Sequence, residues 1–158
     1  WRLWTPTFVH YTLLHLLTNL YLWWLFASKI EQESRLELLI VFLFSAAVAN
    51  ISQWWFEGPN FGGLSGVVYG LLSYLYLLNR FANKPNYKIE GHLGLVMLVL
   101  IPISASGLLG NFSNYAHIGG LVSGAILALA YLLIQAYTGQ TAKPLNTKPL
   151  NTQQDESE

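Results

Sequence analysis

Residues 58–79 read Gly-Pro-Asn-Phe-Gly-Gly-Leu-Ser-Gly-Val-Val-Tyr-Gly-Leu-Leu-Ser-Tyr-Leu-Tyr-Leu-Leu-Asn, a loop followed by a short apolar segment. The glycines and proline before Leu64 are typical of a loop. A helix over 64–79 would be roughly 24 Å long at 1.5 Å per residue, whereas the hydrocarbon core of a bilayer is about 30 Å thick. One end would stop inside the membrane, where free backbone N–H groups are tolerated only against protein or a water cavity. This stretch predicts a helix that begins in a buried, hydrated site.

The composition of the whole chain favours a lipid environment. It is 53% hydrophobic and only 10% charged, whereas soluble domains contain about 45–50% apolar and about 25% charged residues. Six Trp, nine Tyr and eight Phe fit the aromatic belts of membrane proteins. A soluble protein with a large core is the alternative. The absence of cysteine excludes disulfides and thiolate catalysis, and no basic face predicts nucleic-acid binding.

Outward from this stretch, apolar segments predict an all-α, polytopic membrane bundle with five visible spans. Pro102 predicts a kink or an early end in the fourth span. Residues 1–138 would form the membrane domain. Residues 139–158, with Lys-Pro-Leu-Asn-Thr repeated at 143–147 and 148–152, are expected to form a disordered cytoplasmic tail. The five segments are 7–27, 36–55, 64–79, 93–109 and 116–137.

Basic residues predict the orientation of these spans. Alternating sides place seven of the eight Lys and Arg residues in the loops and tail of one side, and only Arg2 on the other. Cytoplasmic loops are enriched in Lys and Arg. The sides where the first, third and fifth spans begin are therefore expected to face outward, and the C-terminus to be cytoplasmic.

A few polar side chains lie within the predicted spans, where exposure of a polar group to lipid costs free energy. Such residues usually face the interior of the bundle and mark function. They fall in the outward half of three separate segments, so they are expected to converge at one depth. These residues are His10, His15 and Asn19 in the first span, Ser65 at the start of the third and His117 at the start of the fifth.

Glycine spacing gives the predicted register of two of these spans. Gly66 and Gly70 form one small-xxx-small motif, and Gly120 and Gly124 form another; such motifs let helices approach closely. If the two motifs pack together, Ser65 and His117 become neighbours. A serine near neutral pH needs an adjacent base to act as a nucleophile, and a neutral imidazole can serve. The alternatives are that the glycines serve packing alone and that His117 is an interhelical hydrogen-bond partner.

The remaining polar residues suggest supporting roles. His15 and Asn19 are four residues apart and share a helix face, so both can donate hydrogen bonds toward an oxyanion at Ser65; polar contacts between helices are the alternative. His10 is expected to be structural. Tyr69 either packs on the His117 ring or is an ordinary packing tyrosine. No acid is placed to complete a triad, and no His-Glu-x-x-His pattern or carboxylate at the same depth predicts a metal site.

Four motifs, in order and on alternating spans, resemble the rhomboid intramembrane proteases over roughly residues 1–138. The segment from Gly62 to Gly70 resembles the family's Gly-x-Ser-Gly active-site segment. Ala116-His117-Ile118-Gly119-Gly120 with Gly124 resembles its histidine helix. His10, His15 and Asn19 resemble its His-x4-His-x3-Asn pattern, and Trp1-Arg2 resembles the Trp-Arg motif of its first outer loop.

The resemblance implies a six-helix core whose first helix would precede residue 1, with a Ser65–His117 dyad in a water-filled cavity open to the outside. It implies an oxyanion and substrate-binding site at His15, Asn19, Gly63 and Leu64, supported by His10, Tyr69, Gly66, Gly120 and Gly124. It also implies single-pass membrane proteins as substrates, no cofactor or metal, and a bacterial inner membrane with the site opening to the periplasm. Access would be controlled by the span near 93–109 and an outer cap near 105–114.

Two positions depart from the family pattern. The family often has Glu-x-Arg where this chain has Glu31-Gln32-Glu33, with Arg35 two places later, so the anchoring of that end is expected to differ. Tyr115 stands where a small residue is common and is expected to narrow the substrate entrance. A non-catalytic binder of client helices is the main functional alternative. A proton or ion carrier ranks last, because membrane carboxylates and repeat symmetry are missing.

Overall fold

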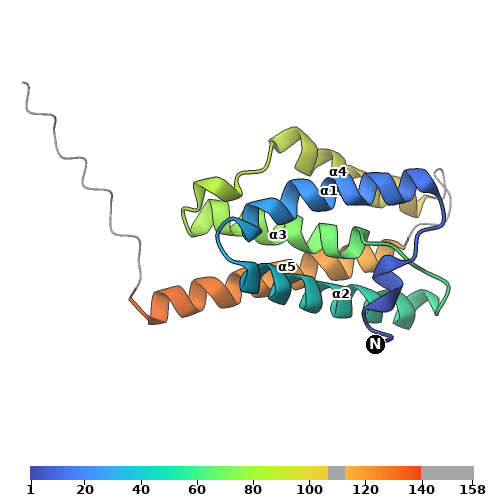
Figure 1. The fold of residues 1–158 in the computed structure, drawn as a ribbon, viewed down its shortest axis with the longest axis horizontal. Helices are drawn as coiled ribbons and strands as arrows, with labels where there is room; N and C mark the ends of the chain where they lie inside the picture. Colours follow the sequence, from blue (N-terminus) through green and yellow to red (C-terminus); the bar gives the residue numbers. More distant parts are fainter. Residues whose placement is uncertain (107–112, 140–158) are drawn as a thin grey trace, which may run out of the picture.

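The computed structural model describes residues 1–106 and 113–139, which form an all-helical bundle (Figure 1). In Figure 1, α3 runs through the middle, and α1, α3 and α5 begin at the same end, where α2 ends. This arrangement confirms the predicted all-α bundle of five long helices. The elements are η1 (Thr5–Phe8), α1 (Leu13–Glu31), α2 (Arg35–Glu57), α3 (Ser65–Phe81), η2 (Pro85–Tyr87), α4 (Gly91–Ala105) and α5 (Asn114–Tyr137).

Local signals explain where several helices begin and end. The side chains of Thr12 and Ser34 accept hydrogen bonds from the N–H groups of His15 and Glu37, which caps the first turns of α1 and α2. α2 ends at Glu57 and is followed by Gly58, whose φ of 86° suits a glycine just after a helix. α4 ends at Ala105, three residues after Pro102, in line with the early end predicted from that proline.

The bundle is packed around α3 and has an apolar exterior. Leu71, Leu75 and Leu78 of α3 are fully buried, while Leu95 of α4 and Leu133 of α5 are more than 60% exposed. α2 and α5 are long and apolar enough to cross a bilayer, and α4 contains a shorter apolar helix. An exterior of exposed leucines suits a protein whose solvent is lipid.

Glycines bring α3 and α5 into backbone contact. A Cβ atom at Gly120 would overlap the Gly66 carbonyl oxygen, and one at Gly124 would overlap the Gly70 carbonyl oxygen. The predicted packing of the two small-xxx-small motifs is therefore confirmed. This register places the first turns of α3 and α5 side by side.

Two predictions about local structure are wrong. The first span was expected to begin at residue 7, but η1 and a loop precede α1, so His10 lies outside the helix. Thr12 is the N-terminal cap of α1, so the helix begins after it and the apolar residues before Thr12 lie outside the helix. The second span was expected to end at residue 55, yet α2 continues to Glu57. Residues 107–112 of the outer cap expected near 105–114, and residues 140–158 of the tail expected at 139–158, lie outside the described residues, so both regions and the division at residue 138 stay predictions.

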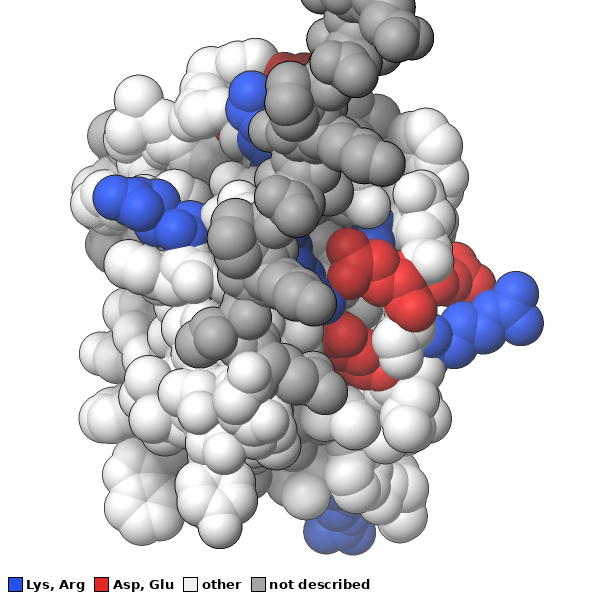
Figure 2. All heavy atoms as spheres, turned by 90° about the vertical axis from the view of Figure 1, so that its left-hand side faces the viewer, with Lys and Arg blue, Asp and Glu red and all other residues white. Residues whose placement is uncertain are grey.

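The end of the bundle opposite Ser65 carries a cluster of charged and phenolic side chains. Lys84 Nζ lies 2.7 Å from Glu33 Oε2 and 3.8 Å from Glu37 Oε2. The hydroxyls of Tyr74 and Tyr87 each donate to Glu37 Oε1 at 2.8 Å. Figure 2 views this end and shows several acidic side chains gathered to the right of centre, with basic side chains spread over the same face. The cluster joins the α1–α2 connection to α2, α3 and the loop after α3.

The cluster keeps its charges in place despite partial burial. Burial lowers the pKa of Lys84, but its hydrogen bond to Glu33 and the charge of Glu37 outweigh burial, so the pKa of Lys84 lies above its ordinary value. Burial, followed by the hydrogen bond to Glu37, raises the pKa of Tyr87. Lys84 therefore stays charged and Tyr87 neutral around pH 7. Glu33 takes part here, at the position where the resemblance noted above would place an arginine. This contact agrees with the expectation that the anchoring of this end differs.

Replacing Lys84 with methionine is expected to destabilise the fold. The substitution leaves Glu33 and Glu37 without their cation, and losing one partner of a partly buried pair costs about 2 kcal/mol. Reversible unfolding in mixed detergent micelles measures the change. Lys88→Met, which removes an exposed lysine of the same loop, is the matched control. Equal unfolding midpoints for the two variants would contradict the prediction.

Candidate active site

Ser65 is the first residue of α3, and the loop before it is held from two sides. Leu64 is the residue before the helix and provides no side-chain cap. The N–H of Gly63 donates to the Pro6 carbonyl oxygen at 3.0 Å. The N–H of Leu64 donates to His10 Nε2 at 3.4 Å. As the first residue of α3, the half-buried Ser65 lies at the positive end of the helix dipole.

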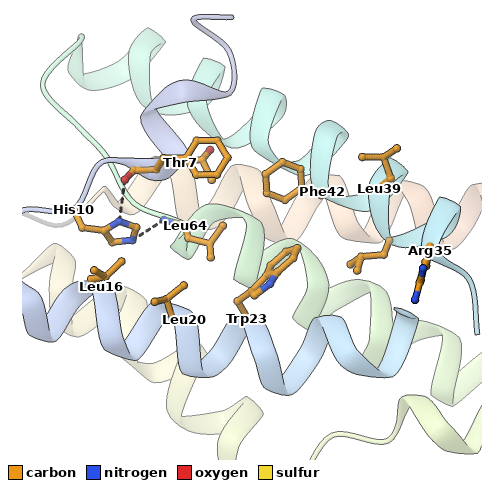
Figure 3. A pocket seen from close by; sticks show the side chains of 11 residues that line it. Thr7, His10, Leu16, Leu20, Trp23, Arg35, Leu39, Phe42 and Leu64 are labelled. Atoms are coloured by element: carbon orange, nitrogen blue, oxygen red, sulfur yellow. Dashed lines mark hydrogen bonds between the residues drawn. The ribbon is translucent and has the colours of Figure 1, made fainter. Parts of the chain in front are cut away.

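His10 has the structural role that its sequence position predicted. Its Nδ1 lies 3.2 Å from the Phe8 carbonyl oxygen while Nε2 accepts from Leu64, so the proton belongs on Nδ1. Figure 3 shows the His10 ring bridging the two segments, at one end of an apolar groove of about 510 Å³ between α1 and α2. His10 thus ties the loop after η1 to the loop before Ser65.

The imidazole of His117 lies beside the Ser65 hydroxyl. Ser65 Oγ is 2.9 Å from His117 Nε2, a distance at which the hydroxyl donates to a neutral imidazole. His117 is only 6% exposed, and the Tyr69 ring lies 4.6 Å from its ring at 34°. The structure brings together the two residues that the glycine register predicted as neighbours.

Tyr69 also connects this pair to α4. Its hydroxyl donates to the Met97 carbonyl oxygen at 2.6 Å. Met97 is 3% exposed, while most of the apolar residues around it on α4 are exposed. One side chain therefore packs on the His117 ring and binds the helix that closes one side of the cavity.

His15 and Asn19 complete the group that the sequence singled out. A side chain at Gly63, whose φ is +131°, would overlap the His15 ring and lie 3.7 Å from Asn19 Nδ2. Asn19 is 3% exposed, and its Nδ2 has no hydrogen-bond partner among the residues that the structure describes. A cavity of about 220 Å³ is lined by His15, Thr18, Asn19, Leu22, Ser65, Val68, Tyr69, Met97, Leu100 and His117.

No carboxylate contacts His117 in the described ranges. The Nδ1 atom of the ring has no hydrogen-bond partner within residues 1–106 and 113–139, so the pair has no third member there. The same residues contain no group of three His, Cys, Asp or Glu side chains able to hold a metal ion. The arrangement supports nucleophilic chemistry by a serine and its base.

Sequence reasoning missed a glutamine next to His117. Gln53 Oε1 accepts a hydrogen bond from the N–H of Ala116 at 3.0 Å, and Gln53 is 2% exposed. The signal was present, because Gln53 is a strongly polar residue near the end of an apolar segment, as is Asn50. Tyr115, expected at the substrate entrance, stacks on Phe56 of α2 at 4.6 Å and 17°.

Comparison with known proteins identifies the family of this chain. The model of the rhomboid domain matches residues 1–134. The rhomboid protease GlpG of Salmonella paratyphi A (strain ATCC 9150 / SARB42) is 38% identical over 138 residues, which cover 84% of this chain and 48% of that protein. The chain thus spans about half the length of this relative. Because the family match extends over most of its residues and includes Ser65 and His117, the chain belongs to the rhomboid family.

Proposed function

We propose that this protein is an intramembrane serine endopeptidase in which Ser65 is the nucleophile and His117 its general base. The observation that carries the proposal is the 2.9 Å separation of Ser65 Oγ and His117 Nε2 in a cavity between helices. The relation to a rhomboid protease supports the same chemistry. A protein that only bound client helices would need neither the hydroxyl nor the imidazole.

The reaction follows from the positions of these atoms. His117 Nε2 takes the proton of Ser65 as Oγ attacks the peptide carbonyl carbon, and it returns that proton to the leaving amine. Water then attacks the acyl-enzyme with His117 again as base, taking a proton from the water, and as the bond between the acyl carbon and Oγ breaks, His117 gives that proton to Ser65 Oγ. The Nδ1–H tautomer leaves Nε2 free for both transfers. A dyad without a carboxylate relies on the packing around His117, including the Tyr69 ring, to orient the imidazole.

The developing oxyanion lies within reach of three kinds of donor. The side chains of His15 and Asn19 line the cavity that contains Ser65, and the first-turn N–H groups of α3 lie at its edge. Donors that point at the position of the oxyanion, in a site sheltered from bulk water, stabilise the transition state more than the substrate. Gly63 keeps the His15 ring close to the segment where substrate would lie, because a side chain there would displace that ring.

The substrates we propose are single-pass membrane proteins cut in or near their spanning segments. The cavity is bounded by α1, α3, α4 and α5 and lies inside an apolar bundle, so a peptide bond reaching it would come from a segment in or beside the bilayer. The excess of basic residues at the end opposite Ser65 supports a site that opens to the outer, periplasmic side of a bacterial inner membrane.

Cleavage of a reporter tests the proposal. Purified protein in liposomes is expected to cleave a reporter spanning segment, and a fluorophosphonate is expected to block cleavage as it forms one adduct at Ser65, located by mass spectrometry. Binding of the reporter with neither cleavage nor a Ser65 adduct would support the alternative, a non-catalytic binder of client helices, and would refute the protease.

Replacing Asn19 with alanine is expected to lower kcat/KM about 100- to 1,000-fold, as for other oxyanion donors. The effect should appear mainly in kcat, because the amide is proposed to bind the transition state rather than the bound substrate. Steady-state cleavage of the reporter measures both constants. Thr18→Ala, which alters the neighbouring residue of the same cavity wall, should change kcat by less than about threefold. A change confined to KM in Asn19→Ala would contradict the assigned role.

A further inference from the structure

The start of α5 lacks a cap of its own. Ser113 precedes the helix and makes no side-chain capping bond. The N–H of Ala116, three residues after Ser113, is one of the donors that a capping side chain usually binds. Its acceptor comes from another helix, because Gln53 Oε1 of α2 lies 3.0 Å away. Gln53 therefore acts as a cap for α5 from outside that helix.

Glu57 sets the direction of the Gln53 amide. Gln53 Nε2 donates to Glu57 Oε2 at 2.5 Å, one turn further along α2. A carboxylate can only accept and the Ala116 N–H can only donate, so a single orientation of the amide satisfies both partners. The flipped amide would place its oxygen against the Glu57 carboxylate and its N–H group against the Ala116 N–H. The acid therefore determines which end of Gln53 meets α5.

The same turn of α2 holds the neighbouring residue of α5. The Phe56 ring stacks on the Tyr115 ring at 4.6 Å and 17°. The last turn of α2 thus holds residues 115 and 116, directly before His117, through Gln53, Phe56 and Glu57.

His117 depends on this contact more than a histidine in a triad would. Its Nδ1 atom has no hydrogen-bond partner within the described ranges, so no second residue there holds the far side of the ring. The position of the ring follows from the backbone of the first turn of α5 and from the Tyr69 ring. A displacement of about 1 Å in a catalytic group can lower a rate about 10²-fold.

We propose that Glu57 is a positioning residue for His117: it orients the Gln53 amide as the cap of α5 and so holds the imidazole at bonding distance from Ser65. The inference rests on the proposed protease function. Glu57 does not touch the Ser65–His117 pair and acts only through Gln53 and the backbone of α5.

A swap of the two side chains tests the inference in the full-length protein in liposomes. Gln53→Glu keeps an acceptor for Ala116 but sets two carboxylates against each other; we expect kcat to fall about tenfold with KM changed less than about twofold. The double variant Gln53→Glu/Glu57→Gln restores a donor and acceptor in reversed order and is expected to return kcat to within about threefold of wild type. Glu57→Leu alone should resemble Gln53→Glu.

The controls separate positioning from folding and from the function itself. Glu90→Leu removes an exposed acid at the opposite end of the bundle and should leave kcat unchanged. Unfolding midpoints should differ little between Gln53→Glu and the double variant. A recovery of kcat then cannot come from a larger fraction of folded protein. A double variant no more active than Gln53→Glu, or a Gln53→Glu variant as active as wild type, overturns the inference while the protease stands. Wild-type protein with neither cleavage nor a Ser65 adduct refutes the protease, and the inference with it.

Discussion

Replacing Ser65 with alanine is expected to reduce reporter cleavage about 10⁴-fold or more, to the background rate, because loss of a serine nucleophile removes the covalent pathway altogether. The hydroxyl is the group that His117 Nε2 contacts at 2.9 Å. No other described residue is placed to attack a carbonyl carbon beside that imidazole. Initial rates of cleavage in liposomes, with variant and wild type at equal protein density, measure the effect.

The Ser65→Ala protein should still fold. The lost contact is one hydrogen bond between the half-buried Ser65 and the buried His117, worth about 1 kcal/mol. Ser73→Ala is the matched control, since Ser73 lies on the same helix and donates to the Leu121 carbonyl oxygen at 2.7 Å, outside the cavity. That variant should keep activity within about threefold of wild type. Cleavage that persists in purified Ser65→Ala protein would rule out the proposed nucleophile.

Replacing Gly120 with alanine is expected to cost about 3 kcal/mol of folding free energy, because the added methyl group overpacks a helix contact. The new Cβ would overlap the carbonyl oxygen and carbon of Gly66, and these are backbone atoms that cannot rotate away. α3 and α5 would have to separate, which moves Ser65 away from His117. We therefore expect cleavage below about one-hundredth of wild type even in the folded fraction.

Gly94, inside α4, offers a control in another helix. A Cβ there would lie 3.8 Å from Leu72 Cδ1, an ordinary van der Waals distance. Both substitutions gain the same helix propensity, about 1 kcal/mol, so their difference reports the contact alone. Unfolding midpoints and cleavage rates of the two variants decide the matter; equal losses would show that the α3–α5 contact is not limiting.

Much of the bundle follows from the sequence because lipid imposes simple rules. Apolar segments gave five helices, and the paired glycines gave the α3–α5 register that places Ser65 beside His117. The start of α1 was missed because the apolar residues before Thr12 continue the hydrophobic run while the backbone does not continue the helix. Hydropathy reports the environment of a residue and not its φ and ψ angles.

The contacts that hold the two ends of the bundle were beyond sequence reasoning. Lys84 meets Glu33 across 51 residues, and Gln53 meets Ala116 across 63. Neither partner has a local pattern that points to the other, since both contacts depend on how α2 lies against α3 and α5. Gln53 could have been flagged as a polar residue in a span, but its hydrogen bond to α5 could not.

The backbone contact between α3 and α5 limits where this protein can change. Those two helices carry Ser65 and His117, and a Cβ at Gly120 or Gly124 would overlap backbone atoms of α3, so most substitutions at these glycines are expected to be removed by selection. Thr18 and Leu22 of α1 and Met97 and Leu100 of α4 face the same cavity from outside that contact. Under the proposed function, substitutions that change the cleavage preference, whether by drift or by directed evolution, should therefore accumulate on α1 and α4. There they can alter the shape of the cavity without moving Ser65 or His117.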